Sequence, residues 1–493
     1  MDVWPKKLLA AAALVASALA AGCTVGPNYH RPAAVVPAKW DVAEPWRESV
    51  PRDALPKGAW WSIFHDDDLN ALEQQALDAN QTIKISAAHL EQARASAAIQ
   101  ISTLFPTFGT APSVERQRIS GNRPAVSSLA VTNPITQSNV TLPFTVSYEV
   151  DLFGRRRRSI EAAGAQYQAS AADFENVRLL ITSELAGDYF SLRQLDSELA
   201  ILNRTVETLR RGLQLVQQRH NGGVASGLDV AQEETLLNTT RTQATLLLQQ
   251  RKQLEDAIAV LVGKPAPDFH LPSKEVTAEP PTLETTLPSD LLERRPDIAE
   301  AERQMAVTNA QIGIAKSAYY PSLNLFAQGG WQAADIAKLA NVASTFWAVG
   351  ANVAEGIFTG GARRAQVQFV QAGYDADVAS YRQTVLAAFQ EVQDSINGLT
   401  VLDQAQQSQQ DAVDSARRTV DIATNRYTGG LVSYLDVVNA QQTLLNNEQQ
   451  MAVIRGQKFV TTVLLVKALG GGWDASSLST FQVKPKAKDA ITP

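Results

Sequence analysis

Two motifs in this chain of 493 residues combine a hydroxyl and a carboxylate at a spacing that could do chemistry. Ser226-x-x-Asp229 and Ser433-x-x-Asp436 each follow a glycine pair, Gly222-Gly223 or Gly429-Gly430. The glycines can end a helix at a positive φ, and the serine and aspartate have the spacing of a capping box that starts the next helix. If several copies of these aspartates met at one place, they would raise one another's pKa or attract a cation. The motifs therefore predict two helical tips. Helix capping is the simpler role for the two aspartates, and an effect of their negative charges can accompany it.

The single cysteine, Cys23, is the second candidate for chemistry. Two lysines precede an apolar run, Leu8–Ala21, which has the order of a secretory signal and is too short to span a bilayer. Leu19-Ala20-Ala21-Gly22-Cys23 resembles a bacterial lipobox, although its leucine lies one place further from the cysteine than is usual. We therefore expect residues 1–22 to be a lipoprotein signal peptide and Cys23 to carry a covalent lipid. Thr24, where an aspartate would retain a lipoprotein in the inner membrane, predicts the outer membrane; an ordinary signal peptide with a chance cysteine is the alternative.

Other chemistry has little support in the sequence. It contains no G-x-x-x-x-G-K-[ST], H-E-x-x-H or G-x-S-x-G motif, and its five histidines share no ligand spacing. One cysteine cannot supply a disulfide framework or a cysteine-based metal site. The formal net charge of -6 argues against a nucleic-acid partner. We therefore expect no enzymatic activity, no metal, and no cofactor beyond the lipid on Cys23.

The chain contains one structural unit twice. Residues 220–230 align with residues 427–437 at an offset of 207, and Gly154-x-Arg156-Arg157 aligns with Gly361-x-Arg363-Arg364 at the same offset. Further upstream the offset becomes 215, so the first copy and the second differ by an insertion between Pro106 and Gly154. The predicted organisation is a lipidated amino-terminal segment (23–66), a first repeat (67–265), a linker (266–287), a second repeat (288–473) and a carboxyl-terminal tail (474–493).

Each repeat is predicted to hold a helix, a β-hairpin and two long helices. The expected ranges are a helix at about 67–104, a hairpin at 105–153 and helices at 155–220 and 227–262, then a helix at about 296–319, a hairpin at 320–358 and helices at 361–427 and 434–469. Along the first long helix, apolar residues recur every three or four positions, which predicts a buried seam. They are Ile181, Leu185, Tyr189, Leu192, Leu195, Leu199, Leu202, Val206, Leu209, Leu213 and Val216. A helix over Arg155–Arg219 would be about 97 Å long, which indicates a rod or a tube.

The hairpins have the pattern of a membrane barrel wall. Residues 140–152 alternate between apolar and polar side chains, which predicts a strand with one apolar and one polar face. A polar stretch, Gln117–Ser138, is expected to be a surface loop. Four strands per chain cannot close a barrel, and open edges in lipid cost several kcal/mol per unpaired group. The chain must therefore oligomerise, and three copies would supply twelve strands.

Four motifs together make the chain similar to TolC-like outer membrane efflux proteins, in their lipoprotein (OprM/NodT-like) branch. They are Cys23-x-x-x-Pro27-x-Tyr29-x-x-Pro32, Arg294-Arg295-Pro296-Asp297-Ile298, Tyr320-Pro321-Ser322-Leu323 and Ala468-Leu469-Gly470-Gly471-Gly472-Trp473. The resemblance implies a mainly α fold with a membrane β-barrel: a homotrimer whose 12-stranded barrel continues into a periplasmic α-helical barrel.

The same resemblance implies a passive exit duct for drugs or other toxic small molecules. Such a duct docks with a periplasmic adaptor (membrane fusion) protein and an inner-membrane pump, most often of the resistance-nodulation-division type. A type I protein-secretion duct on the same fold and a structural lipoprotein without a pore are the alternatives.

The resemblance also suggests roles for single residues at the tips. The glycine turns (Gly222, Gly223, Gly429 and Gly430) would form the periplasmic tip that docks with the adaptor. Acidic residues there, Asp229 and Asp436, would help to close the pore, while Tyr427 would latch it and Leu435 would narrow it. Asn439 departs from relatives that carry an acidic residue at this position.

Two arginine clusters follow the returning strands. Cations near a helix start oppose the helix dipole, so local helix stability does not explain them. We expect a belt that anchors the protein to outer membrane lipid at the membrane–periplasm boundary, with a solvated charge run as the alternative. The first cluster runs from residue 155 to residue 158, and the belt is formed by Arg155, Arg156, Arg157, Arg363 and Arg364.

Overall fold

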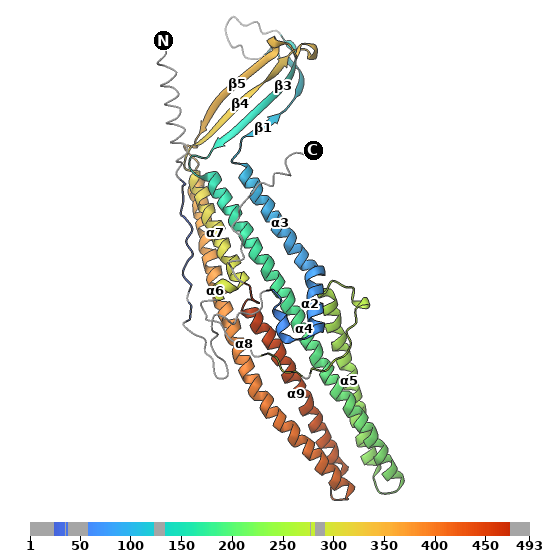
Figure 1. Cartoon of the computed structure of the whole chain (residues 1–493). Coiled ribbons are helices and arrows are strands. Elements are labelled where there is room, and N and C mark those ends of the chain that lie inside the picture. The colour runs from blue at the N-terminus through green and yellow to red at the C-terminus, as the bar shows by residue number, and fades with distance from the viewer. Residues whose placement is uncertain are drawn as a thin grey trace.

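Long helices continue from a narrow β-sheet in the computed structural model, and they end in two tips far from the sheet (Figure 1). The structure describes residues 24–34, 36–37, 58–122, 134–276, 278–281 and 291–473. Within these ranges no helix combines the length and the apolarity that a membrane crossing would need.

The two copies contain helices of equal length. In the first copy α4 (Arg155–Asn221) and α5 (Gly227–Leu261) have 67 and 35 residues, and in the second copy α8 (Ala362–Thr428) and α9 (Tyr434–Ala468) have the same lengths. All four helices begin and end within one residue of the predicted bounds. The offset of 207 residues holds at each of these ends, so the duplication seen in the sequence is confirmed in the fold.

The helix predicted over residues 67–104 is wrong as a single element. It is divided into α2 (Asp67–Ala79) and α3 (Gln81–Ser102) by Asn80, which has an extended ψ of 130°. The Asn80 side chain accepts hydrogen bonds from the N–H groups of Thr82 and Ile83, so it caps α3 instead of continuing α2. At the offset of 215, α7 (Pro296–Ser317) is the counterpart of α3, and the end of α2 corresponds to α6 (Leu291–Arg294), so the break at Asn80 recurs at Arg295 with an extended ψ of 123°. The shorter helical elements are η1 (Trp60–Phe64), η2 (Ala266–Asp268), α6 (Leu291–Arg294), η4 (Ile336–Lys338) and η5 (Val342–Ser344).

The sheet is antiparallel and four strands wide. Its strands are β1 (Thr107–Thr110), β2 (Ser113–Ile119), β3 (Ile135–Val150), β4 (Ser322–Ala333) and β5 (Thr345–Ala354). Both β1 and β2 pair with β3, so together they form one edge that is interrupted at residues 111–112. Pro112 stands in this gap and has no N–H to donate to the ladder. The polar loop expected over Gln117–Ser138 is therefore wrong at both ends, because these residues pair in β2 and β3.

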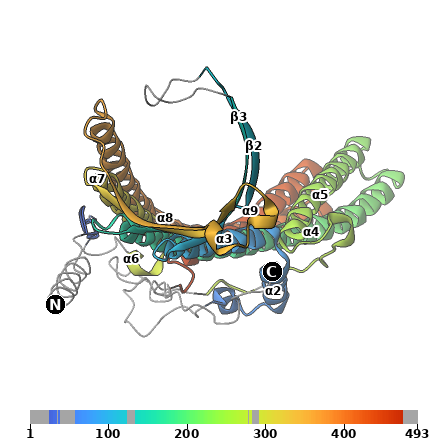
Figure 2. The same cartoon turned by 90° about the horizontal axis from the view of Figure 1, so that it is seen from above.

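The register separates the sheet into an apolar and a polar face. Val146, Ala327 and Val349 lie opposite one another across three strands, and so do Glu149, Asn324 and Asn352 three residues away. Along β3 the apolar row continues through Leu142, Phe144, Tyr148 and Val150. On this row Trp347 and Val349 are 80% and 74% exposed. The strands curve as an arc when seen from above (Figure 2), and within the described residues neither the β1/β2 edge nor the β5 edge has a strand on its outer side.

The main hydrophobic core lies in the middle of the helices, where α4 passes α2, α8 and α9. Leu185 and Leu192 of the predicted seam are fully buried in it. Phe190 of α4 stacks on Phe459 of α9 at 4.6 Å between ring centroids, and Phe64 contacts both rings. The first and second repeats are therefore joined by a shared core and do not form separate domains.

Candidate functional site

The two tips have the same turn geometry. After α4 the N–H of Val224 donates to the carbonyl of Arg219 at 2.8 Å, and after α8 the N–H of Leu431 donates to the carbonyl of Arg426 at 2.9 Å. Gly223 and Gly430 have φ angles of +75° and +73°. The sequence predicted a positive φ for both glycines of each pair. Only the second glycine of each pair has one.

The predicted capping boxes are confirmed at both tips. At the first tip the N–H of Asp229 donates to Ser226 Oγ at 3.2 Å, and the N–H of Ser226 donates back to the Asp229 carboxylate at 3.3 Å. At the second tip Ser433 donates its N–H to Asp436 Oδ2 at 3.0 Å and its hydroxyl to the same oxygen at 2.7 Å. Each aspartate therefore stabilises the start of a helix.

Asp229 also connects the two copies. The hydroxyl of Tyr427, on α8, donates to Asp229 Oδ2 at 3.4 Å. The Tyr427 ring lies 4.8 Å from the ring of Tyr434 and below the Arg219 guanidinium, 5.1 Å away. Burial and the nearby Asp229 carboxylate raise the pKa of Tyr427 above its ordinary value. The structure thus brings Asp229 and Tyr427 together, whereas Leu435 is 47% exposed beside them.

One residue of this region escaped the sequence analysis. Glu233 of α5 is fully buried, and its carboxylate faces Gly212 of α4 and the hydroxyl of Tyr434. A Cβ on Gly212 would lie only 2.5 Å from Glu233 Oε1, so the glycine makes room for the carboxyl. Burial raises the pKa of Glu233, and the Tyr434 hydroxyl opposes this shift. The available signal was the position of Glu233, one turn after Asp229 on the same helical face.

At the opposite end of α4 the first arginines bind acids of the sheet. Arg155 donates from Nε to Glu149 at 3.1 Å, and the Arg156 guanidinium binds the same carboxylate. Asp151 accepts the N–H groups of Arg156 and Arg157 at 3.0 Å each, so it caps the helix start that the arginines would otherwise oppose. Because Glu149 lies on the polar face, these guanidinium groups are held on that side of the sheet, and their contact with lipid stays a prediction.

Arg158 differs from its neighbours, although it belongs to the same predicted cluster. It is 2% exposed and donates to the carbonyls of Val25 and Gly26 and to Asn28 Oδ1, at 3.3, 3.2 and 3.0 Å. A Cβ on Gly26 would lie 2.4 Å from Gly313 Cα, so the segment presses directly on α7.

The amino-terminal segment is fixed along its length. The N–H of Val25 donates to the carbonyl of Phe153 at the foot of β3, and Tyr29 donates to Glu302 at 2.7 Å. Further on, Arg31 donates to the hydroxyl of Tyr381 at 3.1 Å. Cys23 lies outside the described residues, one position before Thr24, which packs against Gly154.

The linker is held on the outside of the helices by a buried charge cluster. Asp196 is fully buried and accepts from Arg251 Nε at 2.7 Å, from Ser273 Oγ at 2.9 Å and from the N–H of Lys274 at 3.1 Å. Farther along, Glu279 binds Lys458 of α9 at 3.0 Å. The linker therefore contacts both repeats.

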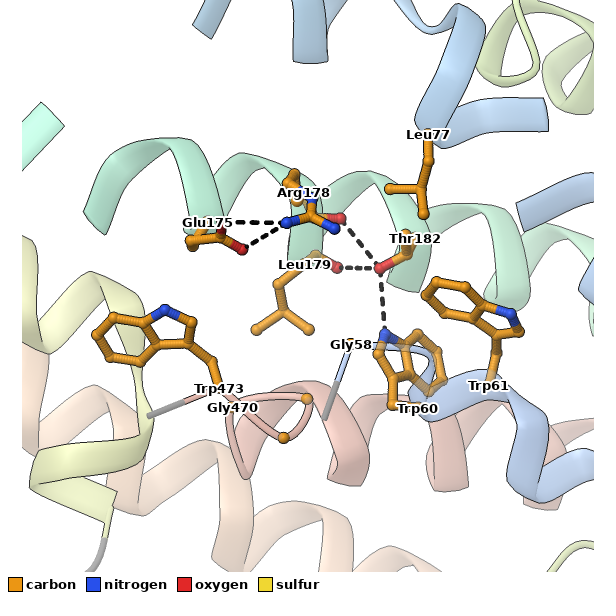
Figure 3. A pocket seen from close by; sticks show the side chains of 12 residues that line it. Gly58, Trp60, Trp61, Leu77, Glu175, Arg178, Leu179, Thr182, Gly470 and Trp473 are labelled. Carbon is orange, nitrogen blue, oxygen red and sulfur yellow. Dashed lines mark hydrogen bonds and ion pairs between the residues drawn. The ribbon is translucent and has the colours of Figure 1, made fainter. Parts of the chain in front are cut away.

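A cavity of about 210 Å³ lies between α4, η1 and the turn that follows α9 (Figure 3). Trp60, Trp61 and Leu179 form apolar walls, and Gly470–Gly472 border it. Trp60 donates from Nε1 to Thr182 Oγ1 at 3.2 Å, which holds η1 on α4. Residues from the amino-terminal and carboxyl-terminal parts of the chain therefore meet α4 around this cavity. Across the described ranges, no group of three or more histidine, cysteine or acidic residues is placed to hold a metal ion.

Comparison with known proteins agrees with this architecture. Residues 72–264 and 287–471 each match the family described as outer membrane efflux protein. The probable efflux pump outer membrane protein SepC of Pseudomonas putida is 32% identical over 462 residues, covering 92% of this chain and 95% of the relative. OprJ of Pseudomonas aeruginosa, an outer membrane protein, is 32% identical over 473 residues, covering 94% and 95%.

Solved structures give the same result for the fold. The outer-membrane channel OprN has a TM-score of 0.83 at 28% identity, covering 92% of this chain and all of that one. The CmeC outer membrane channel of Campylobacter jejuni has a TM-score of 0.83 at 25% identity, covering 92% and 96%. Since both halves match the family and relatives over 30% identical span nearly the whole sequence, this chain belongs to the outer membrane efflux protein family.

Proposed function

We propose that this chain forms the outer membrane exit duct of a tripartite efflux system, through which drugs or other toxic small molecules leave the cell passively. The observation that carries the proposal is the sheet: an apolar face that is exposed in one chain, a polar face opposite, and two unpaired edges, all continuous with helices of 67 residues. Relatives named as toluene, antibiotic and solvent efflux pump outer membrane proteins support small molecules as the cargo. Energy would come from the partner pump.

The duct is a homotrimer in this proposal. Four strand widths per chain leave the edges unpaired, and lipid cannot satisfy the exposed N–H and C=O groups. Three chains would close a 12-stranded barrel with the apolar faces in lipid and the polar faces around water, which fits the size range of such barrels. The long helices would then surround the same axis as a periplasmic tube.

A lipid on Cys23 would lie at the foot of this barrel. Val25 is hydrogen-bonded to Phe153 and Thr24 packs on Gly154, at the junction of β3 and α4. A cysteine one residue earlier could place its acyl chains in the adjacent leaflet, where the sheet begins. This position supports the lipoprotein assignment. The belt of Arg155–Arg157 and Arg363–Arg364 would lie near the same level, at the membrane–periplasm boundary, with its Arg155 and Arg363 side chains on the polar side of the sheet.

The tips would close the duct and meet the partners. Three copies of Asp229 and Asp436 around one axis would form rings of carboxylates, with Tyr427 as the latch between repeats and Leu435 as the narrow point. The turns expose Val224 and Leu431, 70% and 72% accessible, as apolar contacts for a periplasmic adaptor. The adaptor would connect the tips to an inner-membrane pump of the resistance-nodulation-division type.

Single-channel recording in planar bilayers tests the duct and separates the two roles of the aspartates. Asp229→Asn with Asp436→Asn keeps an oxygen that can accept the serine N–H but removes the charge, whereas Asp229→Ala with Asp436→Ala removes both. We expect low conductance for the wild type and openings in both double variants, because both remove the carboxylate rings. Openings only in the alanine variant would show that lost caps open the tip and would contradict charge gating.

Absence of conductance in every variant would contradict the duct itself and favour a structural lipoprotein. In cells, deletion of the gene should lower the minimum inhibitory concentrations of several unrelated compounds. Loss of an exported protein from the medium, with unchanged susceptibility, would favour a type I secretion duct.

A further inference from the structure

A polar cavity of about 430 Å³ lies where the sheet meets the long helices. Glu149 and Asn324, which are cross-strand partners, form one part of its wall, and Ser322 and Ala354, also partners, form another. All four lie on the polar face of the sheet. The cavity therefore opens on the side that lines the duct in the proposed function, on which this inference rests. The charged residues that line it are Glu149, Asp151, Glu355, Arg155 and Arg363.

The duplication allows each arginine here to be compared with its counterpart. In the first copy Arg156 binds Glu149, and Arg157 donates from Nε to Asp151 at 3.2 Å. The residues 207 positions later are Arg363 and Arg364 for the arginines, but Gly356 and Phe358 for the two acids. The second copy therefore keeps the cations and lacks carboxylates at these two positions; its own acid, Glu355, lines the cavity but lies more than 4.0 Å from the Arg363 guanidinium nitrogens.

The contacts of Arg363 agree with this comparison. Among the described residues, no carboxylate oxygen lies within 4.0 Å of a guanidinium nitrogen of Arg363 or Arg364. Arg363 is half-buried; its guanidinium lies 5.9 Å from the centre of the Tyr319 ring, and a Cβ on Gly356 would be 2.7 Å from its Nη2. At the position of Glu149 the neighbour of Arg363 is thus a glycine, which offers no carboxylate to the guanidinium.

We propose that Arg363 forms an anion subsite on the wall of the duct, in the cavity at the foot of the sheet. It would take chloride, or the carboxylate or sulfonate group of a passing solute, because a guanidinium stays charged and its paired N–H donors can bind a single anion or two oxygens of one group. Arg155 lines the same cavity, but its guanidinium already has a carboxylate partner in Glu149. In a trimer the subsite occurs three times at one level, and it favours anions at that level of the passage.

Reversal potentials in a KCl gradient test the proposal in planar bilayers. Each channel carries Asp229→Ala and Asp436→Ala to hold the tip open, and the variants are Arg363→Gln and Gly356→Glu. The second restores the acid that the first copy has; its Cβ would lie 2.7 Å from Arg363 Nη2 and 3.5 Å from Thr359 Cγ2, both of which are side-chain ends. We expect either change to lower the chloride-to-potassium permeability ratio by about twofold at low salt, and the difference to shrink at 1 M KCl, where the Debye length is about 3 Å.

Arg364→Gln is the matched control. It removes the same charge one residue further along α8, from an arginine that is exposed and does not line the cavity. A permeability ratio unchanged by Arg363→Gln would overturn the subsite. An equal decrease in Arg364→Gln would also overturn it, because any positive charge in this region would then have the same effect on the ratio. A channel that conducts but shows neither effect leaves the duct proposal standing, whereas absence of conductance rejects the duct.

Discussion

Asp229 and Glu233 lie one turn apart on α5 and use their carboxyl groups differently. Asp229 is held by the serine cap and by the Tyr427 hydroxyl, so its charge has hydrogen-bond partners. Glu233 is fully buried against Gly212 and Tyr434. A buried carboxyl favours its neutral form, so the packing of the first tip depends on the protonation of this residue.

Glu233→Gln should stabilise the protein at pH 7.5 and weaken the dependence of its stability on pH. Burial raises the pKa of Glu233 above its ordinary 4.5. Below pH 4.5 the carboxyl is neutral in both states; as pH rises towards the higher folded pKa, the unfolded chain loses the proton first and stability falls. Asp229 lies one turn away on the same helix, and Tyr434 of α9 faces the carboxyl with a hydroxyl whose hydrogen bond favours the charged form and partly offsets the burial. We expect calorimetry in detergent to show a Tm higher by about 1–3 °C at pH 7.5 and no gain at pH 4.5.

The matched control for this experiment is Glu234→Gln, which removes the neighbouring, exposed carboxyl. It should change neither Tm nor the pH profile. An equal gain for both variants, or a loss of stability in Glu233→Gln, would show that burial of this carboxyl does not govern the tip.

At the scale of single elements, the long helices depend on a narrow apolar seam. Near the tip, Leu209 of α4 is fully buried against Leu236 and Leu237 of α5, whereas Leu215 on the same helix is 48% exposed. Val206, Leu213 and Val438 pack against these leucines, and the main core, around Phe190, is a separate cluster. Local opening of the tip is therefore set by a small number of side chains.

Leu209→Ala should loosen the end of the first hairpin. Removal of a buried leucine costs about 2–5 kcal/mol in a core that cannot collapse. We expect faster amide hydrogen exchange in peptides that cover residues 205–240, and no change near Phe190. The same substitution at the exposed Leu215 should leave exchange unaltered, and similar acceleration in both variants would contradict a seam at this position.

Local signals explain which elements the sequence predicts well. Caps and periodicity act within a few residues, so the ends of α4, α5, α8 and α9 follow from glycine pairs, serines and apolar spacing. The break at Asn80 was missed because the helical pattern continues on both sides, and the Asn80 amide also donates to the distant carbonyl of Leu261.

Residues that act through tertiary contacts were harder to predict. The contact of the buried Asp196 with Arg251, the position of Arg158 and the environment of Glu233 all depend on segments that are far apart in the chain. By contrast, the alignment of the two repeats already shows that the second copy has a glycine where the first copy has Glu149. The consequence for Arg363 could be inferred only from the hydrogen bonds that Glu149 makes in the structure.

For the whole molecule, the two free sheet edges determine how chains assemble. The β1/β2 edge and the β5 edge belong to opposite sides of one sheet, so each can pair with the other edge of a neighbouring copy. Such a contact is heterologous and closes only at a defined number of chains.

Disulfide trapping should show that this number is three. In a Cys23→Ser background, which removes the only native thiol, Thr110→Cys is combined in turn with Ala348→Cys, Val349→Cys or Gly350→Cys. Adjacent strands bring Cβ atoms within disulfide range, so oxidation of one of these pairs in the outer membrane should give two-chain and three-chain bands on denaturing gels, and none larger. Val146→Cys with Ala327→Cys, which are partners within one chain, should give only the single-chain band. A ladder that stops at two chains or continues past three would rule out the trimer.

The equal lengths of the paired helices also limit how this protein can evolve. One inserted residue in α4 would displace everything beyond it by about 1.5 Å and rotate it by about 100°, while α8 kept its original reach. The Tyr427–Asp229 bond would then be out of register, because its two ends sit on different repeats. A change in the length of one long helix would have to be matched in the equivalent helix of the other repeat. We therefore expect natural variation in size to accumulate in the linker and in the loops between strands.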